Sequence, residues 1–143
     1  MVLSINSPSY FSTEYGIDDE VYWMCRSLSR FVEEKNYSNL IHTIGIVPLI
    51  APKEMIDCGK WREYIDGMPK YGVVTVSVQT DFYEYLHAGI RQRKWMIIDN
   101  ILRSVKKIAK RYKIDYLTFE ADVKKFCIEN SITCEKDTLS SDS

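Results

Sequence analysis

The sequence predicts an α+β fold, with a small sheet of three to four strands, helices packed mainly on one face of that sheet, and a long amphipathic helix near the C-terminus. Two patterns lead to this class. Residues 73–79 alternate valine with polar residues, which is typical of a strand with one buried and one polar face. Residues 91–112 repeat apolar side chains every three or four positions, as a long amphipathic helix does.

A strand–helix–strand unit is expected at the N-terminus. Residues 2–5 form a short apolar strand. Asp18 and Asp19 begin a helix, because short acidic side chains cap and complement a helix N-terminus, and this helix ends near Lys35. Residues 40–50 hold a second strand that is apolar on both faces, as expected of a central strand. A right-handed crossover would make these two strands parallel neighbours.

The elements that follow are inferred from the same signals. Thr80 or Asp81 caps a short helix that ends before Gly89. Glycine and proline mark a turn earlier in the chain. The predicted order is a short helix within 52–66, a turn at 67–72, a strand at 73–79, a short helix to residue 87, the long helix at 91–112 and a last helix at 116–129.

The 143 residues are enough for one domain with a core of its own. We expect a single α+β domain over residues 1–130 and a polar, flexible tail over 131–143. No apolar run reaches membrane-spanning length, and the first residues lack the features of a signal peptide. The four cysteines form no C-x-x-C pair, so we expect reduced thiols and a cytoplasmic location, without membrane contact.

Charge is unevenly distributed along the chain. The whole sequence has 19 basic and 20 acidic residues, yet the stretch from Arg91 to Lys113 contains nine basic residues and a single acid, Asp99. The rest of the chain is therefore strongly acidic. Opposed fields on one small domain influence its choice of partner and not its fold.

No catalytic, metal or cofactor site is predicted. A side-chain nucleophile needs a base within reach, and only His42 and His87 are available as imidazole bases. His42 borders an apolar strand, where a structural histidine with satisfied hydrogen bonds is the favoured interpretation. Glu84 and His87 share a helix face with Asp81, but no fourth ligand accompanies them, so a solvated helix face is favoured over a metal site. The sequence thus favours a protein that is not an enzyme.

The basic helix has two interpretations. It can be the solvated outer face of an amphipathic helix, which we favour, or it can contact phosphates as part of a nucleic-acid-binding or regulatory module. No aromatic side chain interrupts the basic face to stack on bases, and no direct contact with nucleic acid is expected. The alternative basic face consists of Arg93, Arg103, Lys107, Lys110 and Arg111.

The acidic side of the chain is the predicted binding surface. Trp23 points away from the apolar stripe of the first helix, and an outward tryptophan among arginines and acids is typical of protein–protein hot spots. In the alternative, Trp23 packs beneath a loop and the acids only complement the helix dipole. The first group of the surface comprises Glu14, Tyr15, Asp18, Asp19, Glu20, Trp23, Arg30 and Glu34. A second group would extend it if the middle segment folds beside the first helix, and comprises Asp57, Trp61, Glu63 and Asp66.

Several further segments are informative as a set. They are the N-terminal strand leading into Ser7-Pro8-Ser9-Tyr10-Phe11 and an acidic helix, the strand Ile44-Gly45-Ile46-Val47, the run Pro69-Lys70-Tyr71 before the 73–79 strand, and the long helix before Asp115-Tyr116, Phe119 and Asp122. Together they span most of residues 2–129, and none is a catalytic signature. In this overall pattern the chain resembles an immunity protein of a bacterial polymorphic toxin system, of the contact-dependent growth inhibition kind.

The resemblance implies a small, cytosolic protein without enzymatic activity. Such proteins bind the toxin domain encoded beside them and block its activity. Many of these toxins are nucleases, often acting on tRNA, and their substrate clefts are basic, so an acidic face would complement them. The implied partner is the C-terminal domain of a cognate toxin. No cofactor is implied, and the oligomeric state is left open.

Overall fold

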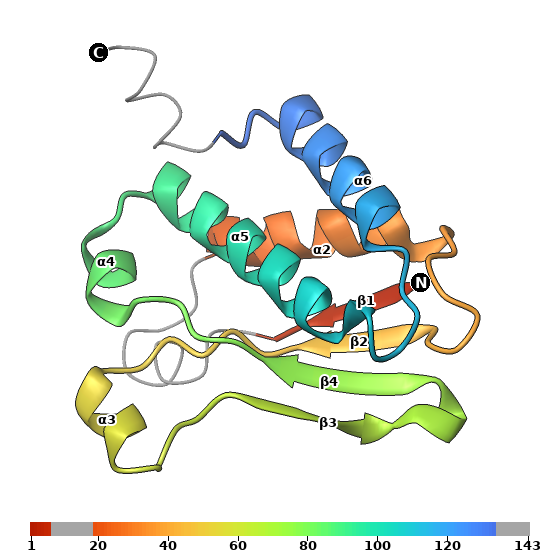
Figure 1. Cartoon of the computed structure of the whole chain (residues 1–143). Coiled ribbons are helices and arrows are strands. Elements are labelled where there is room, and N and C mark those ends of the chain that lie inside the picture. The colour runs from red at the N-terminus through yellow and green to blue at the C-terminus, as the bar shows by residue number, and fades with distance from the viewer. Residues whose placement is uncertain (7–18, 134–143) are drawn as a thin grey trace.

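A four-stranded sheet organises the structure, a computed structural model that describes residues 1–6 and 19–133 (Figure 1). The strand order is β1-β2-β4-β3. β2 pairs in parallel with β1 and with β4, and β3 pairs antiparallel with β4. The strands are β1 (Val2–Ile5), β2 (Thr43–Ile46), β3 (Tyr64–Met68) and β4 (Val73–Ser77). The predicted α+β class and the parallel pairing of the first two strands are confirmed.

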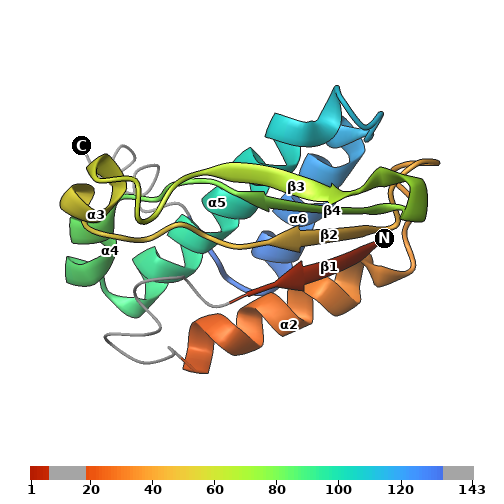
Figure 2. The same cartoon turned by 90° about the horizontal axis from the view of Figure 1, so that it is seen from below.

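The three long helices lie on the same face of this sheet, as predicted (Figures 1 and 2). The two short α-helices lie at the end of the sheet where β2 and β4 finish (Figure 1). Asp81 caps the second of them, since its side chain accepts the Glu84 N–H at 2.7 Å. The helices are α2 (Asp19–Glu33), α3 (Lys53–Asp57), α4 (Phe82–His87), α5 (Ile90–Ala109) and α6 (Tyr116–Glu129), with a 3-10 helix, η1 (Pro69–Tyr71).

The core lies between the sheet and the long helices. Leu3, Ile44 and Val74 are neighbours across three strands and are at most 3% exposed. Residues one position along each strand face the other side of the sheet, which no described helix covers (Figure 2). On that open face Val2 is 42% exposed and Met68 is 58% exposed.

The second strand is apolar on both faces, as noted from the sequence, but only one of these faces is buried. β2 is central in the sheet, as predicted, and Ile44 and Ile46 are fully buried. Thr43 and Gly45, which alternate with them, are only half-buried because they lie on the open face. The apolar run fits the central position of β2 in the sheet. Helices cover only one face of the sheet, so the other face of β2 is left uncovered.

The short helix predicted within 52–66 is confirmed as α3, whereas the turn predicted at 67–72 is wrong in part. β3 was not predicted, and it occupies the last residues of the first segment and the first two residues of the second. Asp66 and Gly67 disfavour a strand locally, so pairing with β4 decides the structure. A Cβ atom on Gly67 would lie 2.5 Å from the carbonyl oxygen of Val73, so only glycine allows the two backbones to approach this closely.

The chain remains packed against the core beyond α6. Ile132 is 8% exposed, and its N–H donates to the carbonyl of Cys127 at 2.8 Å. Residues 134–143, which hold most of the predicted tail, lie outside the described residues, so the boundary at residue 130 stays a prediction. Among the described helices, none is both long and apolar enough to cross a membrane.

Candidate functional site

The outer face of α2 presents two aromatic side chains to solvent. Trp23 is 58% exposed and Tyr22 is 41% exposed, and their rings meet edge to face with centroids 5.3 Å apart. The opposite side of the helix buries Val21, Met24 and Leu28, which turns these rings outward. The orientation of Trp23 is therefore the one that the predicted binding surface requires.

A groove lies between Trp23 and the neighbouring helices α5 and α6. Its volume is about 280 Å³, and Trp23, Phe126 and Ile132 contribute apolar side chains to its lining. Glu20 and Lys94 stand on opposite walls and form an ion pair at 3.9 Å. An exposed tryptophan beside a concave surface is an arrangement that can anchor a protein partner.

Charge varies along the exposed face of α2. Asp19 and Glu20 are exposed in the first turn, where negative charge complements the helix N-terminus. Arg26 and Arg30 are exposed in the next turns, and Glu34 is exposed just past the helix. The described surface is thus acidic at its start and mixed further along. Three members of the predicted group lie outside the described residues, namely Glu14, Tyr15 and Asp18.

The C-terminal end of α2 is fixed by two sets of contacts. The Met1 amino group donates to the carbonyls of Val32 at 3.3 Å and Glu33 at 2.8 Å, and burial lowers the pKa of this amine while the charge of Glu33 opposes that effect. The Tyr37 hydroxyl donates to Asp122 of α6 at 2.7 Å. Burial, reinforced by the hydrogen bond and the charge of Asp122, raises the pKa of Tyr37 well above its usual range. These contacts hold α2 against the rest of the domain.

The second acidic group lies at the opposite edge of the sheet from α2. β3 forms that edge, whereas α2 lies beside β1 (Figure 2). Glu63 pairs with Lys107 at 3.4 Å, and Asp66 lies on β3 itself. Asp57 is exposed and Trp61 is half-buried. The middle segment therefore does not fold beside the first helix, and the two groups do not form one continuous surface.

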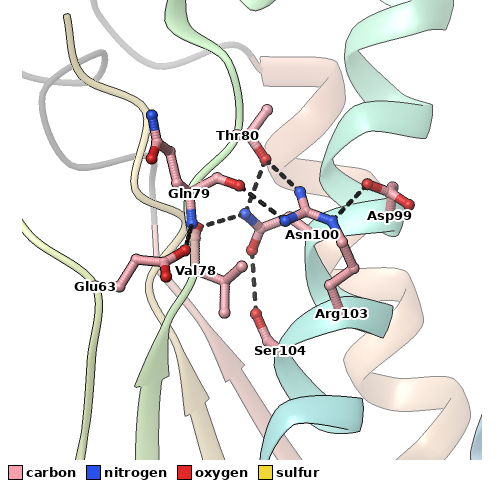
Figure 3. Close-up of polar contacts among 8 residues, drawn as sticks. All are labelled: Glu63, Val78, Gln79, Thr80, Asp99, Asn100, Arg103 and Ser104. Atoms are coloured by element: carbon pink, nitrogen blue, oxygen red, sulfur yellow. Dashed lines mark hydrogen bonds and ion pairs between the residues drawn. The ribbon is translucent and has the colours of Figure 1, made fainter. Parts of the chain in front are cut away.

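Part of the predicted basic face is engaged within the protein. The Arg103 guanidinium donates to Asp99 at 2.8 Å, to the Gln79 carbonyl at 2.9 Å and to the Thr80 hydroxyl at 3.2 Å (Figure 3). Lys107 pairs with Glu63, as described above. These contacts reduce the positive charge that α5 could offer to phosphates.

The remaining members of this face differ in their surroundings. Arg93 donates to the carbonyls of Tyr85 and Leu86 at 3.0 and 2.9 Å, and so ties α5 to the C-terminal end of α4. Lys110 and Arg111 are exposed. The described structure therefore weakens the nucleic-acid interpretation, because only these last two residues present their charge without such a polar contact to the described protein.

Asn100 is a buried polar residue that the sequence patterns did not single out. Its amide nitrogen donates to the Val78 carbonyl at 2.7 Å and to the Thr80 hydroxyl at 2.9 Å, and its amide oxygen accepts from the Ser104 hydroxyl at 3.2 Å (Figure 3). The residue is fully buried. This network fixes α5 against the segment that follows β4. An asparagine within the apolar stripe of a helix is the signal that would have located it.

The histidines of the described structure differ from what a metal site requires. Both ring nitrogens of His42 lie 2.8 Å from hydrogen-bond partners, the Thr43 hydroxyl and the Tyr71 carbonyl. This confirms a structural histidine with satisfied hydrogen bonds. Within residues 1–6 and 19–133, no group of three or more histidine, cysteine, aspartate or glutamate side chains is placed to hold a metal ion.

Comparison with known families decides the class of the protein. The model of the family described as immunity protein 44 (Imm44) matches residues 1–129. The chain belongs to the immunity protein 44 family. The predicted resemblance to the immunity proteins of polymorphic toxin systems is thereby confirmed. No match was found among curated proteins or among solved structures.

Membership in the immunity protein 44 family supports a toxin-neutralising function and implies a cognate toxin as partner. Immunity proteins are generally inhibitors and not enzymes. An inhibitor of this kind acts through a surface that binds its target. In the described part of this chain, the exposed aromatic pair of α2 and the grooves beside it are among the features suited to such a surface.

Proposed function

We propose that this protein neutralises a nuclease toxin of a contact-dependent growth inhibition system by forming a stoichiometric complex with the toxin's C-terminal domain. The observation that carries the proposal is the exposed Trp23 beside the acidic first turn of α2, in a chain of an immunity protein family. A nuclease, such as one acting on tRNA, binds its substrate in a basic cleft, and Asp19 and Glu20 would complement that charge. Occupying the cleft or covering the approach to it would exclude the substrate.

The aromatic and the charged residues have different roles in this proposal. Trp23 contributes a large apolar surface that loses water on binding, so it lowers the rate of dissociation. Asp19 and Glu20 act at longer range and raise the rate of association. We also infer that the protein acts in the cytoplasm, which suits the free thiols of Cys25, Cys58 and Cys127.

The test uses the toxin domain encoded beside this chain in its genome. The two purified proteins should co-elute at equal stoichiometry, and the immunity protein should protect RNA or DNA from the toxin. A toxin domain that neither binds the protein nor is inhibited by it contradicts the proposal. A complex that blocks an activity other than nucleic-acid cleavage contradicts only the nuclease assignment.

Two variants test the surface. Trp23→Ala should weaken binding by about 30-fold, corresponding to a hot-spot loss of about 2 kcal/mol. Leu117→Ala on α6 is the matched control, because Leu117 is also apolar and is 77% exposed. Asp19→Lys combined with Glu20→Lys should slow association and reduce its salt dependence, whereas Lys110→Glu combined with Arg111→Glu should not slow it. Equal affinities for the Trp23 and Leu117 variants would exclude the α2 surface.

A further inference from the structure

The two edges of the sheet differ in their capacity to accept another strand. At the β3 edge, the Asp66 carboxylate already accepts the Gly67 N–H at 2.8 Å, and Pro69 follows the strand directly. Charged side chains and proline are the usual means by which proteins block strand addition. β1 has the sequence Val-Leu-Ser-Ile, which contains neither a charge nor a proline. Only the β1 edge therefore lacks this protection.

The main chain of β1 directs hydrogen-bonding groups away from the sheet. The N–H groups of Val2 and Asn6 point toward β2 and donate to the carbonyls of His42, just before that strand, at 2.7 Å and of Ile46 at 2.9 Å. In a parallel pair, alternate residues direct their groups to the same neighbour, so those of Leu3 and Ile5 point outward. Within the described ranges, no hydrogen bond reaches the outward N–H and C=O groups of these two residues. These groups are what an added strand would bind.

A groove runs along this edge, between β1 and α2. Its volume is about 510 Å³, within the range of sites that enclose ligands. α2 lies above the core face of the sheet and outside β1, so it overhangs the position of a fifth strand (Figures 1 and 2). The four residues of β1 span roughly 13 Å, which sets the length of strand that can pair here. The α2 side is lined by Tyr22, Cys25, Arg26, Ser29, Arg30 and Glu33.

We propose that this groove receives an extended segment of the toxin domain, which pairs with β1 as a fifth strand and carries an acidic side chain toward Arg26 and Arg30. The inference rests on the proposed function and names the mode of binding. The outward groups of Leu3 and Ile5 supply main-chain hydrogen bonds, which give affinity in this mode of recognition. The two guanidinium groups, one turn apart on α2, supply charge-assisted bonds to a carboxylate, which give selectivity.

The charges of the groove favour a toxin segment over a second copy of this chain. If β1 of another copy paired here, the added strand itself would carry no acid toward Arg26 and Arg30, since β1 has none. Tyr22 borders this groove, and its ring contacts that of Trp23 on the outer face. A toxin strand bound at β1 and a toxin pocket that receives Trp23 would therefore belong to one continuous interface.

The proposal is tested in the complex of the full chain with its toxin domain. Hydrogen exchange should slow at least 100-fold at the amides of Leu3 and Ile5 on complex formation, with no comparable change at Ile65, whose N–H points outward at the opposite edge. Ile5→Pro removes an outward N–H without removing a bond to β2, and Ile5→Ala is its matched control because it removes the same side chain and keeps the N–H. The proline variant should bind at least tenfold more weakly than the alanine variant.

A surface variant covers the case in which Ile5→Pro does not fold. Arg26→Glu combined with Arg30→Glu should weaken binding at least tenfold, with unfolding transitions like those of the unaltered protein. A complex in which Leu3 and Ile5 stay unprotected and the arginine variant binds normally overturns the inference and leaves the proposed function intact. Protection of the same amides in the protein alone, with a doubled mass in solution, overturns it in favour of a second copy. Absence of any complex with the unaltered protein overturns the proposed function as well.

Discussion

Replacement of Asn100 by alanine should destabilise the fold by about 3 kcal/mol, because the change removes three hydrogen bonds whose net contribution is about 1 kcal/mol each. The cost should not greatly exceed that sum. The Val78 carbonyl still accepts the Leu49 N–H at 3.0 Å, and the Thr80 hydroxyl still accepts from Arg103. Only the buried Ser104 hydroxyl loses its partner, and it can turn to a carbonyl in the preceding turn of α5.

The assay is urea unfolding followed by far-ultraviolet circular dichroism. With an m-value of about 2 kcal/mol/M, a loss of about 3 kcal/mol in the free energy of unfolding should lower the urea midpoint by roughly 1.5 M, and the m-value should not change. Asn39→Ala, at an exposed position, is the matched control and should change stability by less than about 0.5 kcal/mol. Ser104→Ala should cost about 1 kcal/mol, and the double variant less than the sum, because the two residues share a bond. A midpoint that falls by less than about 0.5 M in Asn100→Ala would refute the role given to this network.

Two further predictions concern backbone geometry and pH. Gly67→Ala should lower the free energy of unfolding by at least about 2 kcal/mol, because its Cβ would meet the Val73 carbonyl at 2.5 Å, whereas Gly59→Ala, with open space around it, should cost only about 1 kcal/mol for its positive φ. Equal losses in urea unfolding would contradict this. Burial raises the pKa of Cys25 from 9.0 to about 12, so the unfolded chain loses this proton first and stability falls as pH rises above 9. Between pH 7.5 and pH 10.5, Cys25 should account for roughly 2 kcal/mol of that fall under reducing conditions, and Cys25→Ala should show a correspondingly smaller fall. An identical fall in both proteins would argue against it.

The sequence was most informative where structure depends on local periodicity. The valines of β4 and the apolar stripe of α5 specify their elements within a single window, and α6 begins and ends at the predicted residues. β3 could not be found in this way, because Asp66 and Gly67 take strand geometry only through pairing with β4. The apolar run of β2 did not by itself indicate its open face, since such a run does not reveal how many layers cover the strand.

In the candidate site, too, features set by one helix could be predicted, and features set by contacts between elements could not. The outward orientation of Trp23 follows from the periodicity of one helix, and it was predicted. Whether charges on different elements meet depends on tertiary structure, so the pairing of Glu63 with Lys107 and of Arg103 with the Gln79 carbonyl could not be read from the basic run. The separation of the two acidic groups could not be predicted either, because it depends on the strand order of the sheet.

The packing of α2 on α5 and α6 has a consequence for protein synthesis. The apolar side of α2 completes its core contacts only when helices from the other end of the domain are present. At ~5–20 residues per second, translation from the end of α2 to the end of α6 takes roughly 5–20 s. During that interval α2 can pack against β1 but not yet against α5 and α6, so its outer face is not yet held in its final orientation. A cell that relies on this protein therefore needs a standing pool of finished chains before the toxin is encountered.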